Sequence, residues 1–184
     1  MRRIPSGLMV IVAIVLAVLG GMALAAQDKY TVQVPNGLAF SEFRGYEDWQ
    51  VVAVSQPQEP KVKLNVIVAN PAMIDAYRAG VPGNGKPFPD GSKIAKIGWN
   101  PKQSAEAPAP TMVPDTLAGV GFIVKDSRRF PDTGGWGYAQ FDYDAASDTF
   151  TPNTSMQGSD AKCGFACHTI VAAKDYIFTA YGKR

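Results

Sequence analysis

The segments QVVAVS at residues 50–55 and VKLNVIV at residues 62–68 indicate the fold class of this chain. Both are rich in β-branched residues, which favour strands. Residues 61–66 alternate between polar and apolar side chains, as a strand does when only one of its faces is buried. We therefore predict two strands here, which could pair antiparallel.

The rest of the chain continues as short β-type runs separated by Pro and Gly. The further strands that we predict are at residues 92–99, 120–124 and 136–143, the last one ended by a turn at 144–148. Within the first of these, Ile94, Lys96 and Gly98 share one face. Residues 81–90 are expected to form a surface loop, and residues 100–110 a long irregular connection.

Two segments are predicted to be helical. Asn70 and Pro71 precede residues 72–79, and Gly80 follows, which matches the start and end signals of a short helix. Residues 160–171 suit a second short helix, or a turn leading into one. The predicted fold is therefore mainly β (α+β): an antiparallel sheet with a few helices.

The N-terminus has the composition of a secretory signal. Two arginines precede an uncharged apolar run at residues 7–19, and Ala23-Leu24-Ala25 has the small-x-small form that signal peptidase cuts after. An uncleaved membrane anchor is the alternative, because the uncharged stretch at 7–26 is about as long as the 20 residues that span a bilayer. We expect residues 1–25 to be removed and the protein to be periplasmic, attached to the membrane only if the signal stays uncleaved.

Residues 26–184 are about the size of one domain. The chain has 18 Lys and Arg, of which Arg2 and Arg3 belong to the signal, so the remaining 16 equal the 16 Asp and Glu. A nucleic-acid partner requires a basic face that neutralises phosphates. We therefore expect no nucleic-acid partner.

Residues 162–168, KCGFACH, contain both cysteines and the single histidine of the chain. In c-type haem attachment, two thiols bond to the haem vinyl groups and the adjacent imidazole takes an axial position on the iron. Cys163, Cys167 and His168 have this order, although three residues rather than the usual two separate the cysteines. The alternative is a disulfide between Cys163 and Cys167, which an oxidising compartment allows. We favour haem c, because three rare residues rarely meet in one hexapeptide by chance.

Four segments of the mature chain form a series: DGSKIAK at 90–96, VKDSRRF at 124–130, WGY at 136–138, and the cysteine-histidine segment followed by DYIFT at 175–179. In order and spacing this series resembles the cytochrome P-460 family, over most of the chain from about Tyr46 to Tyr181. The resemblance implies a mostly antiparallel β domain, usually a homodimer. It also implies one high-spin haem c with a histidine on one side of the iron and an open site on the other.

The resemblance further implies a function and a special lysine. Family members that oxidise hydroxylamine carry a lysine bonded to the haem ring, and Lys96 occupies the matching place after Asp90-Gly91. Without the resemblance, Lys96 would be an ordinary exposed strand residue. We expect redox chemistry on hydroxylamine or nitric oxide, with electrons passed to a partner cytochrome. A distal carboxylate would act as base; Asp142 and Asp144 are the candidates, although solvated turn residues are the simpler interpretation.

Two other functions stay open. Related beta-type c-prime cytochromes bind gases such as nitric oxide and carbon monoxide in an apolar distal pocket. The candidate residues for such a pocket, each of which could also be plain core, are Phe88, Phe122 and Phe141. Electron transfer would need a second iron ligand, for which the candidates are Met73, Met112 and Met156. A Ser-His-Asp triad or a multi-histidine metal site is excluded, because the single histidine is already assigned.

Overall fold

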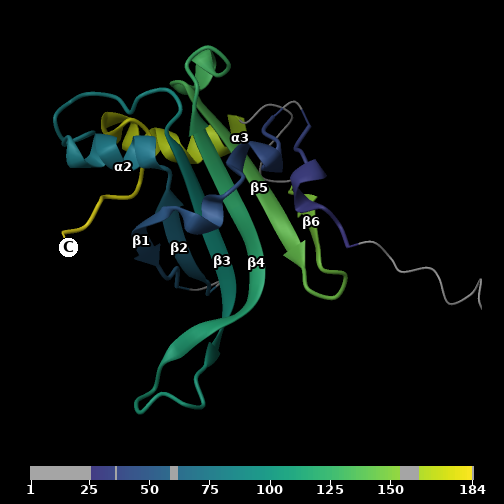
Figure 1. Cartoon of the computed structure of the whole chain (residues 1–184). Coiled ribbons are helices and arrows are strands. Elements are labelled where there is room, and N and C mark those ends of the chain that lie inside the picture. Colours follow the sequence, from purple (N-terminus) through teal and green to yellow (C-terminus); the bar gives the residue numbers. More distant parts are fainter. Residues whose placement is uncertain (1–25, 36, 59–61, 154–161, 184) are drawn as a thin grey trace, which may run out of the picture.

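The computed structural model describes residues 26–35, 37–58, 62–153 and 162–183 (Figure 1). Within these residues, six strands form one antiparallel sheet in the order of the sequence. The strands are β1 (Gln50–Ser55), β2 (Leu64–Ala69), β3 (Lys93–Gln103), β4 (Met112–Lys125), β5 (Trp136–Asp144) and β6 (Thr149–Pro152). The expected signal peptide at residues 1–25 lies outside the described residues. The described helices include none that is long and apolar enough to cross a membrane.

Two α-helices and five 3-10 helices accompany the sheet among the described residues. They are η1 (Lys29–Thr31), η2 (Phe40–Phe43), η3 (Tyr46–Asp48), α2 (Pro71–Arg78), η4 (Pro131–Thr133), α3 (Lys162–His168) and η6 (Thr169–Lys174). The predicted first helix is confirmed as α2. The Asn70 side chain accepts a hydrogen bond from the Met73 N–H and so caps its start, and Gly80, with φ of 90°, follows its end.

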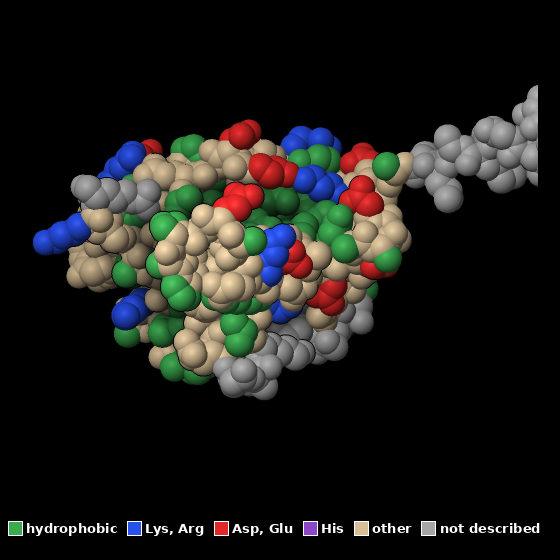
Figure 2. All heavy atoms as spheres, turned by 90° about the horizontal axis from the view of Figure 1, so that it is seen from below, with side chains coloured by type: hydrophobic (Ala, Val, Ile, Leu, Met, Phe, Trp, Pro, Cys, Tyr) green, Lys and Arg blue, Asp and Glu red, His purple; other side chains and the backbone are tan. Residues whose placement is uncertain are grey.

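Both faces of the sheet are covered. On one face the N-terminal segment with η1 to η3 packs an aromatic cluster around Phe40, Phe122 and Phe141. On the other face α2, α3 and the C-terminal segment pack around Met73, Trp136 and Ile177 (Figure 1). The domain is therefore a central sheet between two layers. Lys and Arg are interspersed with Asp and Glu on the face seen in Figure 2, and no large surface of one sign is visible there.

The predictions for residues 92–124 were wrong in extent. The strands at 92–99 and 120–124 continue much further, because β3 reaches Gln103 and β4 begins at Met112. The irregular connection expected at 100–110 is confined to the loop at residues 104–111. Two of the prolines in and after this segment, Pro101 and Pro114, lie opposite each other at a shift in register. Here β3 and β4 extend past their neighbours β2 and β5 as a two-stranded ribbon, and Pro is tolerated in a strand without an outer partner.

Candidate functional site

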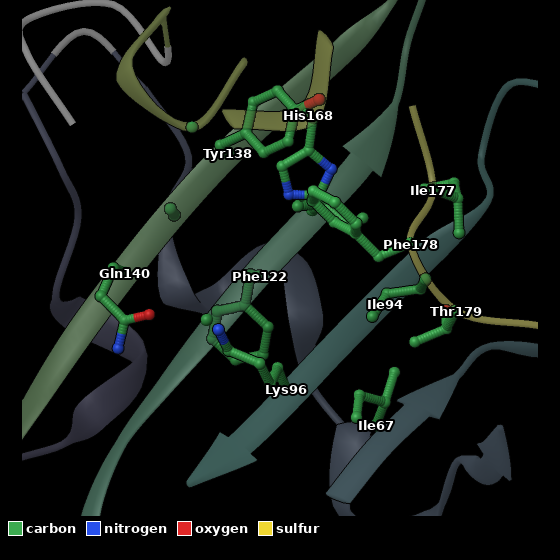
Figure 3. A pocket seen from close by; sticks show the side chains of 14 residues that line it. Ile67, Ile94, Lys96, Phe122, Tyr138, Gln140, His168, Ile177, Phe178 and Thr179 are labelled. Atoms are coloured by element: carbon green, nitrogen blue, oxygen red, sulfur yellow. The ribbon is translucent and has the colours of Figure 1, made fainter. Parts of the chain in front are cut away.

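A half-open pocket of about 190 Å³ lies between the sheet and α3 (Figure 3). Strands β2 to β5 form its floor, and α3 and residues 177–179 form the rest of its wall. Most lining residues are apolar. The polar side chains among them are Lys96, Tyr138, Gln140, His168 and Thr179. Ile94 and Lys96 both line this pocket, which confirms the prediction that they share one face of their strand.

Helix α3 carries His168 to the pocket because it packs closely on β5. Gly164 lies over Tyr138: a Cβ atom placed on Gly164 would be only 2.6 Å from Tyr138 Cβ. The His168 ring then packs between Tyr138 and Phe178, with both ring centroids 4.8 Å away. These contacts place the imidazole at one side of the pocket (Figure 3).

One hydrogen bond fixes the chemical form of His168. Its Nδ1 lies 2.5 Å from the carbonyl oxygen of Tyr176, and a carbonyl only accepts, so Nδ1 carries the proton and Nε2 keeps its lone pair. Burial lowers the pKa of His168, and the positive charge of Lys96 lowers it further, against the Tyr176 carbonyl that raises it. The imidazole is therefore neutral at neutral pH, which is the form that binds a metal.

Lys96 lies on β3 at the other side of the pocket from His168 (Figure 3). Its side chain passes over Gly121, where an added Cβ would be 3.7 Å from Lys96 Cε and 2.8 Å from Gln140 Oε1. Among the described residues it has no hydrogen-bonding or ion-pair partner. Gln140 and Phe178 also line the pocket. Neither could be predicted as a lining residue, because each becomes a neighbour of His168 or Lys96 only through strand pairing and chain reversal.

The two cysteine positions lie in α3 with His168. Cys167 is exposed and its thiol is free, while the Cys163 side chain lies outside the described part of the structure. The spacing of three residues puts the two positions about one helical turn apart. Both cysteine positions can therefore lie on the same side of α3. Haem attachment through their thiols stays a prediction.

Several other candidates lie away from the pocket. Asp142 and Asp144 are exposed and accept hydrogen bonds from Asn153 and Ser147 respectively. Neither lines the pocket, which agrees with the simpler interpretation that both are solvated. No carboxylate lines the pocket among the described residues.

The aromatic and methionine candidates are also placed elsewhere. Phe88 and Phe141 are buried in the core. Phe122 borders the pocket, but its ring stacks with Phe43 in the aromatic cluster on the other face of the sheet. Met73 is fully buried in the core and Met112 is exposed at the start of β4. Neither lines the pocket, and Met156 lies outside the described residues.

A model of the cytochrome P-460 family matches residues 43–179 of the chain. The chain belongs to the cytochrome P-460 family. A search of curated proteins finds no significant match. Cytochrome P-460 proteins are haem c iron proteins, so the cofactor predicted from the cysteine-histidine segment and from the resemblance is confirmed at the level of the family.

The residues of this cytochrome P-460 pocket fit a haem. Its largely apolar wall suits the faces of a porphyrin, and a neutral histidine offers Nε2 as an iron ligand. The residues available to hold the haem are Cys163, Cys167 and His168.

Proposed function

We propose that this protein binds hydroxylamine or nitric oxide at an open axial position of haem c and carries out redox chemistry on it. One observation carries the proposal. The single histidine of the chain lies on one side of the pocket, and Lys96 and Gln140 lie on the other. Neither a methionine nor a second histidine lines the described pocket, so the pair of ligands typical of an electron-transfer haem is not in place among the described residues.

The chain's residues have distinct roles in this proposal. The thiols of Cys163 and Cys167 would each add across a vinyl group: the S–H bond and the vinyl π bond break, one C–S and one C–H bond form, and no electrons are transferred on balance. His168 Nε2 would bind the haem iron, with the imidazole held in place by the bond from its Nδ1 to the Tyr176 carbonyl. When bound, the haem supplies an iron centre that binds the small ligand and changes oxidation state.

The polar side chains opposite His168 would orient the ligand. Gln140 and Thr179 both line the pocket and can donate or accept hydrogen bonds. Oxidation of hydroxylamine to nitric oxide releases three protons and three electrons. We propose that the electrons pass to an acceptor cytochrome and that the protons leave through water at the open side of the pocket.

Lys96 would distinguish a hydroxylamine-oxidising member. We propose that its Nζ bonds to a carbon of the haem ring, since it lines the pocket without a polar partner among the described residues. The bond removes one N–H and one C–H hydrogen, so a two-electron oxidant of the peroxide class is required. The two hydrogens and two electrons convert one peroxide to two waters.

The test is an absorption spectrum of the ferrous protein made together with haem-maturation proteins. A ring bonded to Lys96 gives a Soret band shifted far to the red, and Lys96→Ala should move that band back. Lys102→Ala is the matched control, because Lys102 is an exposed lysine of the same strand that pairs with Asp115. A spectrum that Lys96→Ala leaves unchanged rejects the bond.

The oxidation itself is tested without oxygen, with hydroxylamine and an oxidised cytochrome as electron acceptor. We expect the acceptor to be reduced by the wild-type protein and more slowly by Lys96→Ala. A wild-type protein that leaves the acceptor oxidised contradicts the enzymatic proposal.

Gas binding is the second candidate, favoured by the apolar wall and by the absence of a carboxylate among the described lining residues. It predicts tight binding of nitric oxide or carbon monoxide without reduction of the acceptor.

We also propose, from the sequence of residues 1–25, that the protein acts in the periplasm. The homodimer implied by the resemblance stays a prediction, which the mass of the native protein in solution would test.

A further inference from the structure

A buried ion pair joins Lys125 on β4 to Asp175 at the end of η6. Lys125 Nζ lies 2.7 Å and 3.0 Å from the two carboxylate oxygens of Asp175, and the two side chains are 8% and 11% exposed. A buried ion pair is costly unless further hydrogen bonds satisfy both partners. Here they do: Lys125 also donates to the Gly134 carbonyl, and Asp175 also accepts from the Phe88 N–H, both at 2.8 Å.

This pair holds an unusual turn of the backbone. Asp175 and Tyr176 are both in the left-handed region, with φ of 49° and 63°. Asp tolerates this conformation better than most residues, but a bulky residue such as Tyr rarely adopts it. Two successive residues of this kind persist only where the surroundings fix them. The three bonds to the Asp175 carboxylate come from β4 and from the loop before β3, so they fix the turn from outside η6.

The turn sets the position of one atom that matters for the haem site. It directs the Tyr176 carbonyl at His168 Nδ1. A hydrogen bond at this nitrogen fixes the tautomer and orientation of a ligating imidazole and raises its basicity. The chain of contacts therefore runs from Lys125 through Asp175 and the Tyr176 carbonyl to His168.

We propose that Lys125 and Asp175 are positioning residues for the axial histidine. The inference deepens the proposed function and rests on His168 being the iron ligand. The ion pair holds the Tyr176 carbonyl in place, and that carbonyl sets how strongly the imidazole donates to the iron. Loss of either charge loosens the turn, so the His168 bond to Tyr176 lengthens and the imidazole becomes a weaker donor.

The test uses the haem-loaded protein and the iron–histidine stretching band in resonance Raman spectra of its ferrous form. Asp175→Asn is the mildest variant, because Asn tolerates the left-handed region and keeps an oxygen for the Phe88 N–H. Lys125→Met removes the other charge. We expect both variants to shift the band to lower wavenumber and broaden it, and to raise the reduction potential, because a weaker donor stabilises ferric iron less.

Two further variants keep the test decisive. Lys102→Met breaks the exposed pair of Lys102 with Asp115, whose side chains are 60% and 40% exposed, and should change neither the band nor the potential. If Lys125→Met does not fold, Lys125→Met/Asp175→Asn removes both charges, leaves neither buried alone, and should show the same shift.

The outcomes separate the two proposals. A wild-type protein without an iron–histidine band rejects His168 as the ligand and with it the proposed function. A wild-type band that is present, and that Asp175→Asn and the double variant leave unmoved while the melting temperature falls, overturns the positioning role. The ion pair would then serve stability alone.

Discussion

Gly164→Ala is expected to destabilise the protein, although helix propensity alone predicts the opposite. In an ordinary helix interior, Ala is favoured over Gly by about 1 kcal/mol. In α3, however, the added Cβ would be 2.6 Å from both Cβ and Cγ of Tyr138. The helix would have to move from β5 by about 0.8 Å to reach the 3.4 Å of ordinary contact. Overpacking of this kind costs about 1–3 kcal/mol.

The net expectation is a loss of about 0–2 kcal/mol, once the gain in propensity is subtracted. For a domain of this size, each kcal/mol lowers the melting temperature by about 2–4 °C. Thermal unfolding of the haem-loaded protein measures the loss, and the same displacement of His168 should alter its ferrous spectrum. Gly182→Ala is the matched control, because nothing lies within 4 Å of a Cβ there. A Gly164→Ala protein that melts higher than the wild type, with an unchanged spectrum, would refute the close packing of α3 on β5.

Three further variants test other parts of the structure. Phe40→Ala should cost about 3–5 kcal/mol, measured by denaturant unfolding, because the Phe40 ring is fully buried among five aromatic neighbours; a cost below 1 kcal/mol would contradict a core there. Burial raises the pKa of Glu42, but hydrogen bonds from Arg129 and the Ala39 N–H together lower it by more. The ionised Glu42 therefore contributes about 0.5–1 kcal/mol of stability above its pKa in the unfolded chain, about 4.3. This contribution is lost as the pH falls through the lower pKa that Glu42 has in the folded protein. Glu42→Gln should flatten this acid dependence in unfolding curves, and a slope like that of the wild type would disprove it. Cys167→Ser should leave haem held by one bond, detected as a changed ferrous absorption band; an unaltered band would show that Cys167 is not bonded to haem.

Local patterns were enough to predict the sheet and its first helix. Alternation at residues 61–66 and the signals at Asn70, Pro71 and Gly80 act within a few residues, and β2 and α2 form where those signals lie. The extent of β3 and β4 could not be predicted in this way. Whether Pro101 breaks a strand depends on whether a neighbouring strand needs a backbone N–H at that position, and that is decided by where β2 ends.

The candidate site likewise combines residues that could be predicted from local sequence with contacts that could not. His168 and Lys96 were found in sequence, the first by its place beside Cys167 and the second by the resemblance to cytochrome P-460 proteins. Their meeting in one pocket, and the bond from His168 to the Tyr176 carbonyl, arise from contacts between distant segments. Whether the candidate base Asp142 lines the pocket could not be decided from sequence, because its place on β5 gives no indication of how far the pocket extends along the strand.

The central claim is that haem is bound covalently at the cysteine-histidine segment of α3. The most direct measurement is the mass of the denatured protein, made together with haem-maturation proteins, followed by the mass of the peptide that contains Cys163 and Cys167. The account predicts the added mass of one haem on that peptide, retained after denaturation and abolished when both cysteines are replaced by Ser. A peptide without added mass, or one lighter by two hydrogens because the two sulfurs are bonded to each other, would contradict it.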